Sequence, residues 1–138
     1  MGILRRGATA KDLQRVVGGL EHAYAEEDWY PACDALETLE RIRVGIPPEI
    51  VEAAYREAPF SRVCSYACRV LVAAHRERFS RGFAVEVLWD CEAETRAIGA
   101  KCADLSCEGA SARLSTLILD ERQDEGVRDA ALSRGLDR

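Results

Sequence analysis

Apolar residues recur every three or four positions along most of this chain, and strict alternation of apolar and polar residues is almost absent. This spacing places the apolar side chains of each segment on one side of an α-helix. In the first segment that side carries Leu13, Val16, Val17, Leu20 and Tyr24. Residues 85–88 could begin a strand, but no second strand-like segment follows to pair with them. The pattern therefore predicts an all-α protein.

Capping and helix-breaking residues divide the pattern into about eight helices. Thr9 and Ser61 are suitable N-caps, Pro59 ends a helix, and Ser80 with Gly82 indicates a turn. The predicted helices span residues 10–26, 30–43, 47–57, 61–78, 83–91, 94–105, 110–120 and 125–136. Long and short helices alternate, which indicates a series of helix pairs.

The long helices also repeat a sequence pattern. Equivalent positions begin at Tyr30, Arg62, Arg96 and Arg128, with spacings of 32, 34 and 32 residues. Three residues later every copy has a small residue, and nine residues later the first three copies have leucine. A single pair of helices of this size has an apolar face that it cannot bury by itself, so adjacent pairs must pack against it. We therefore expect one domain, with an N-terminal capping helix in 1–27, pairs in 28–60, 61–92 and 93–120, and a C-terminal cap in 121–138.

Two segments resemble a known repeat family. ETRAIGAKCADL (94–105) and EGVRDAALSRGL (125–136) each place an acidic residue before a Thr-Arg or Val-Arg pair, followed by small residues and leucine. This pattern, with Asp90 and Asp120 ending the preceding helices, is similar to short bacterial HEAT-like repeats. The resemblance implies a short α-solenoid of antiparallel helix pairs. It also implies that Arg96 and Arg128 bridge neighbouring repeats, and that the shorter helices line the concave surface.

The charge of the chain narrows the choice of partner. Nineteen basic and 24 acidic side chains give a net charge of −5, with acidic clusters at 26–28 and 120–129. Binding to nucleic-acid backbones requires clustered Lys and Arg, so no nucleic-acid partner is predicted. The charge permits a protein partner with a basic surface. No apolar run approaches the length of a membrane span or a signal peptide, so we predict a cytoplasmic protein without a membrane partner.

Candidate chemistry is sparse. Cys64 and Cys68 lie one helical turn apart and could share a metal with Cys33 or His75, but they belong to the apolar stripe expected in the core. We predict free structural cysteines and neither metal nor cofactor. The chain has two histidines, no nucleophile motif and no glycine-rich phosphate loop, so no catalytic residue is predicted.

The shorter helices carry the candidate binding residues. Trp89 is the preferred anchor, because Trp, Tyr and Arg are enriched where protein interfaces bind most tightly. Packing between repeats is the alternative role for such an aromatic side chain. The predicted partner-binding residues are Glu52, Arg56, Glu86, Trp89, Arg113 and Thr116.

These observations predict a non-catalytic protein-binding adaptor or scaffold. One alternative is an immunity or antitoxin-type inhibitor, whose carboxylates would occlude the basic active site of a toxin enzyme. Another is an enzyme subunit or a lyase-like HEAT protein, since some relatives of the family act on bilin attachment or as DNA glycosylases. The acidic charge disfavours the DNA-directed version.

Overall fold

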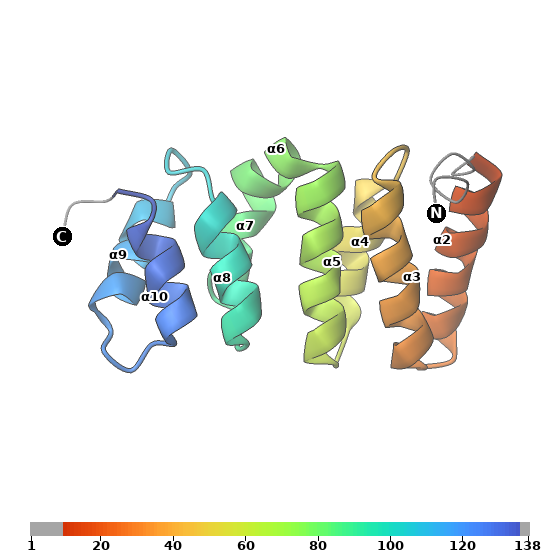
Figure 1. Cartoon of the computed structure of the whole chain (residues 1–138), viewed down its shortest axis with the longest axis horizontal. Coiled ribbons are helices and arrows are strands. Elements are labelled where there is room, and N and C mark those ends of the chain that lie inside the picture. The colour runs from red at the N-terminus through yellow and green to blue at the C-terminus, as the bar shows by residue number, and fades with distance from the viewer. Residues whose placement is uncertain (1–9, 136–138) are drawn as a thin grey trace. The chain divides into compact units, whose positions relative to one another are not determined.

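The computed structural model describes residues 10–135, and this part of the chain consists of helices joined by turns, without a strand (Figure 1). The prediction of an all-α fold with about eight helices is confirmed. Thr9, the predicted first cap, and residue 136, the predicted end of the last helix, lie outside the described residues. The chain forms two compact units, Met1–Ala74 (unit 1) and His75–Arg138 (unit 2).

The described part of unit 1, residues 10–74, contains four helices. They are α2 (Ala10–Ala25), α3 (Trp29–Ile42), α4 (Pro48–Glu57) and α5 (Ser61–Ala74). Helix α3 packs against α2 on one side and α5 on the other, and α4 packs against α5. The largest fully buried side chains of the unit are Leu20, Leu36, Leu39, Val51, Val63, Val70 and Leu71. Burial of these apolar side chains is the main favourable contribution to folding of the unit.

The turn between α3 and α4 follows from its sequence. Arg43 (φ 65°) and Gly45 (φ 75°) have left-handed backbones, and the Arg43 N–H donates to the carbonyl of Leu39. This contact satisfies one of the carbonyl groups that a helix leaves unpaired at its end. Pro48 then occupies the first position of α4, where a missing N–H costs nothing.

A tyrosine connects the first helix to the third in unit 1. The Tyr24 hydroxyl donates to the carbonyl of Ala54, and its ring contacts Trp29 edge to face with centroids 5.2 Å apart. Burial raises the pKa of the Tyr24 hydroxyl above its usual value of 10.0, and the neighbouring Cys64, Glu57 and Cys33 raise it further. The neutral phenol is therefore the form that the folded unit stabilises.

Unit 2 contains shorter elements. They are α6 (Arg76–Arg78), the π-helical turn η1 (Phe79–Phe83), α7 (Ala84–Val87), α8 (Ala93–Cys102), α9 (Ala110–Leu119) and α10 (Glu125–Leu132). Helix α8 packs against α7 and α10, and α10 packs against α9. The largest fully buried side chains in this unit include Phe79, Val87, Leu88, Leu114 and Leu117.

The structure corrects the sequence prediction around residues 75–91. The predicted helix 61–78 ends at Ala74, because His75 has non-helical backbone angles (φ −139°, ψ 52°). The predicted turn at Ser80 and Gly82 is wrong, since both residues lie in η1. Phe79 and Phe83 are both buried there, with ring centroids 6.0 Å apart, and burial of two aromatic rings outweighs the low helix propensity of Gly82.

The repeat organisation of the whole chain stays a prediction. The predicted pair 61–92 includes α5 of unit 1 and α7 of unit 2. Within unit 1, α3 and α5 are in contact, and within unit 2, α8 and α10 are in contact, so helices that carry the repeated sequence pattern pack side by side inside each unit.

Candidate functional site

The most exposed aromatic side chain of unit 2 is Trp89, which lies just after the end of α7 with 67% of its surface exposed. The guanidinium of Arg113, on α9, stacks on one face of its ring, with Cζ 3.9 Å from the ring centroid. Arg113 Nε also donates to the carbonyl of Leu88 at 3.2 Å. The cation–π contact and this hydrogen bond together fix the indole while leaving most of it open to solvent.

Helix α9, which provides Arg113, also has a row of exposed residues. Ala112, Thr116 and Leu119 follow each other at helical spacings of four and three residues, and all three are exposed, Leu119 by 69%. The Thr116 hydroxyl donates to the carbonyl of Ala112, so it uses its proton within its own helix. We call Trp89, Ala112, Arg113, Thr116 and Leu119 the Trp89 surface.

Four of the six predicted binding residues lie in unit 2. Trp89, Arg113 and Thr116 belong to the Trp89 surface, and Glu86 is exposed on α7 one turn before Trp89. The remaining two, Glu52 and Arg56, lie one turn apart on α4 of unit 1, where Glu52 is half-buried and Arg56 exposed. The structure thus brings Trp89 and Arg113 into direct contact.

Two acidic turns border the Trp89 surface. The first, residues 90–94, follows Trp89 and includes the first two residues of α8, and the second, residues 120–125, follows Leu119 and includes the first residue of α10. Asp90 and Asp120 begin these turns in the same way, each accepting a hydrogen bond from the N–H two residues later, at 2.8 and 2.9 Å. Together the turns contain seven carboxylates and one guanidinium, that of Arg122.

Arg96 holds the two acidic turns together. Its Nη1 donates to the carbonyls of Asp90 and Cys91, both at 2.9 Å, and its Nη2 donates to Oε1 of Gln123 at 2.7 Å. The positive charge of Arg96 is therefore directed at the backbone of one turn and the side chain of the other. Burial lowers the pKa of the Arg113 guanidinium, and the nearby positive charge of Arg96 lowers it further.

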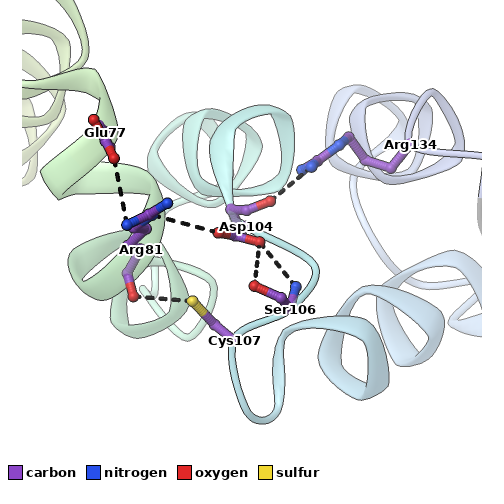
Figure 2. Close-up of polar contacts among 7 residues, drawn as sticks. Glu77, Arg81, Asp104, Ser106, Cys107 and Arg134 are labelled. Carbon is purple, nitrogen blue, oxygen red and sulfur yellow. Dashed lines mark hydrogen bonds and ion pairs between the residues drawn. The ribbon is translucent and has the colours of Figure 1, made fainter.

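A second polar cluster fastens the loop after α8 (Figure 2). Asp104 Oδ1 accepts hydrogen bonds from the hydroxyl and the N–H of Ser106, and these bonds lower the pKa of the Asp104 carboxyl. Arg81 pairs with Glu77 at 3.3 Å, and the Cys107 thiol donates to the Arg81 carbonyl at 2.9 Å. These contacts attach the loop to η1, which is a structural role.

Arg134 binds main-chain carbonyls at the end of α8. Its guanidinium donates to the carbonyls of Ala100 and Ala103, at 2.8 and 2.6 Å, close to Asp104 in Figure 2. These carbonyls belong to the last turn of α8 and the residue after it, where a helix has unpaired acceptors and a favourable site for a cation.

The cysteines are all free thiols, and Cys33 and Cys68 are buried in the core of unit 1. The Cys64 thiol lies near the carbonyls of Tyr55 and Ala58, at 3.5 and 3.8 Å. Among residues 10–135, no three His, Cys, Asp or Glu side chains gather in a way that could hold a metal ion. No helix in the same range is long and apolar enough to cross a membrane.

Sequence reasoning missed two parts of this picture. Leu119 was not singled out, although its spacing from Ala112 and Thr116 places it on the same exposed side of α9. The loop cluster was also missed, although Asp104 followed by Ser106 is a typical signature of a turn closed by an aspartate side chain.

Comparisons with protein-family models, with curated proteins and with solved structures give no significant match for this chain.

Proposed function

We propose that this chain is a non-catalytic protein-binding module, acting as an adaptor or scaffold, and that its partner contacts the Trp89 surface. The observation that carries the proposal is the exposed but fixed indole of Trp89, stacked against Arg113. Large apolar side chains that are rigid before binding make strong interface anchors, because little conformational entropy is lost when a partner covers them. Leu119, exposed on α9, extends the area available to a partner.

The HEAT-like solenoid is part of this proposal. Its support lies in unit 2, where Asp90 and Asp120 close similar turns and Arg96 and Arg128 each donate to a main-chain carbonyl of the preceding segment. Arg96 donates to the carbonyl of Asp90, and Arg128 Nε donates to that of Ile118 at 3.3 Å. In both cases the fourth residue of the helix is an arginine whose guanidinium binds the main chain of the segment before that helix.

Affinity capture with matched variants tests the binding proposal. The immobilised full chain is incubated with an extract of the native host, and retained proteins are quantified by mass spectrometry. We expect Trp89→Ala to reduce retention of the specific partner at least roughly tenfold, as loss of a central aromatic anchor does. Tyr30→Ala is the matched control, because Tyr30 is an equally exposed aromatic residue (74%) on α3 of unit 1.

One outcome of the capture experiment would contradict the proposal. If wild type, Trp89→Ala and Tyr30→Ala retain the same proteins in the same amounts, the Trp89 surface is not the binding site. Far-ultraviolet circular dichroism of both variants checks that the helices are intact.

An inhibitor of a basic enzyme, of the immunity or antitoxin type, is the second candidate. The acidic turns favour it, since seven carboxylates beside an exposed apolar surface would suit an active site rich in arginine and lysine. Inhibition of a captured enzyme by the wild-type chain, and its relief by Trp89→Ala, would distinguish this candidate from a scaffold.

A further inference from the structure

We propose that the segment bound at the Trp89 surface is cationic and amphipathic, with apolar side chains against Trp89 and Leu119 and with Lys or Arg side chains against the acidic turns. This inference rests on the proposed function and adds the chemistry of the partner.

The apolar half of the proposal follows from the order of residues along the chain. Trp89 is followed directly by Asp90, and Leu119 is followed directly by Asp120. Each exposed apolar side chain therefore stands at the entrance of an acidic turn, and the two turns are connected through Arg96. A ligand that contacts either apolar side chain therefore lies next to an acidic turn.

Of the three arginines near the surface, Arg113 and Arg96 already have contacts for their guanidinium groups, and Arg122 is exposed in the second acidic turn. Arg113 covers one face of the Trp89 ring, so a cation from the partner is excluded from that face by charge repulsion. Arg96 directs its guanidinium at two carbonyls and Gln123. What the turns present to solvent is mainly carboxylate, and the exposed acidic side chains are those of Glu92, Glu94, Asp120, Glu121, Asp124 and Glu125.

Charge complementarity thus selects the occupant. A neutral apolar segment would bring no opposite charge to these carboxylates, and a second copy of this chain would bring its own net charge of −5 against them. A segment with apolar residues on one side and Lys or Arg beside them satisfies both parts of the surface.

The probe is a fluorescein-labelled helical peptide of about 14 residues with leucine on one face and lysine on the other, long enough for roughly four helical turns. Its control peptide has glutamate in place of every lysine. Fluorescence anisotropy with the full chain should show binding of the lysine peptide, loss of this binding in Trp89→Ala, and no binding of the glutamate peptide. Affinity for the lysine peptide should fall with added salt, because exposed charges are screened.

Charge-reversal variants test whether the carboxylates of the acidic turns contribute to binding of the peptide. The double variant Glu94→Lys/Glu121→Lys should weaken binding of the lysine peptide by roughly tenfold or more, an effect expected for several charge pairs together. The matched control is Glu21→Lys/Glu26→Lys, which makes the same change in net charge on exposed positions at the end of α2 and just after it. This control should bind the peptide within about twofold of wild type, after allowance for long-range charge.

The outcomes separate this inference from the function on which it rests. Equal binding of the lysine and glutamate peptides, or equal weakening by the two double variants, would overturn the cationic partner while Trp89-dependent capture from the extract still stood. Failure of that capture would overturn the function itself. A dimer in sedimentation velocity that dissociates in Trp89→Ala would also overturn the inference, because a second copy would then occupy the surface.

Discussion

Arginine side chains in unit 2 illustrate how the same residue type serves different purposes. Arg96, Arg128 and Arg134 are half-buried and donate to main-chain carbonyls near helix ends. Arg113 makes one such bond and also stacks on Trp89. A planar guanidinium with five N–H groups can do both at once, which an ammonium group cannot. These arginines position the site, and Trp89 remains the side chain most available to a partner.

Tyr24 gives unit 1 a stability that depends on pH. Its pKa is raised in the folded state, so the unfolded chain loses this proton first as the pH rises. The stabilisation is therefore fully present below about pH 10, the ordinary pKa of tyrosine, and is lost above it. We expect the free energy of unfolding of the wild type to fall as the pH rises from about 9.5 to about 11.5.

Tyr24→Phe isolates this contribution. At neutral pH it should cost about 1 kcal/mol, the usual value of the lost hydrogen bond to Ala54. Between about pH 10 and pH 11.5 its stability should fall less steeply than that of the wild type. Urea unfolding followed by circular dichroism at several pH values measures both effects. Parallel curves for the two proteins over the alkaline range would show that Tyr24 does not titrate with unfolding.

At the scale of single residues, sequence reasoning placed Leu13, Val16, Val17, Leu20 and Tyr24 on one apolar stripe, of which Leu20 is buried and the other four are half-buried. It could not identify the contact between Trp89 and Arg113, because these residues are far apart in the chain and meet only when α9 packs beside the end of α7.

Helix packing in this protein depends on one glycine and makes no use of two others. Gly99 lies where α8 approaches α7, and a Cβ there would be 3.1 Å from the Ala84 carbonyl oxygen and from Val87 Cγ1. Gly18 and Gly19 lie inside α2, where a Cβ would have no atom within 4 Å. Glycine in a helix interior destabilises it relative to alanine, so the two positions predict opposite effects of the same substitution.

Gly99→Ala should destabilise the protein by about 1–3 kcal/mol, because the obstructing atoms include main chain that cannot rotate away. Gly18→Ala should stabilise it by about 0.5–1 kcal/mol, because helical backbone is retained and the unfolded chain becomes less flexible. Urea midpoints of the two variants provide the measurement. A stabilising Gly99→Ala would contradict the close approach of α8 and α7.

At the scale of elements, hydrophobic periodicity located the helices but misplaced several ends. The prediction merged α5 with α6 and placed a turn in η1. Local propensity favours a turn at Ser80 and Gly82, whereas burial of Phe79 and Phe83 and the hydrogen bond from the Asp104 N–H to the Ser80 carbonyl hold that segment in a π-helical turn. That hydrogen bond joins residues 24 positions apart, and a periodic pattern does not record such contacts.

For the molecule as a whole, charge is the property most directly tied to partner choice. The excess of carboxylates should repel phosphate backbones, which bind proteins through clustered Lys and Arg. We expect no retardation of a short DNA duplex or single-stranded RNA in gel-shift experiments at about 100 mM salt with up to roughly 10 µM protein. A shift that disappears with added salt would contradict the predicted absence of a nucleic-acid partner.

The sequence by itself determined the helical class, the approximate number of helices and the acidic charge, because spacing of apolar residues and side-chain ionisation are properties of the chain alone. Tertiary structure decided where helices end near His75 and Ser80, which arginines turn inward, and how Trp89 is fixed while exposed. These features depend on contacts between distant residues, whose energies exceed the local preferences that a sequence pattern reveals.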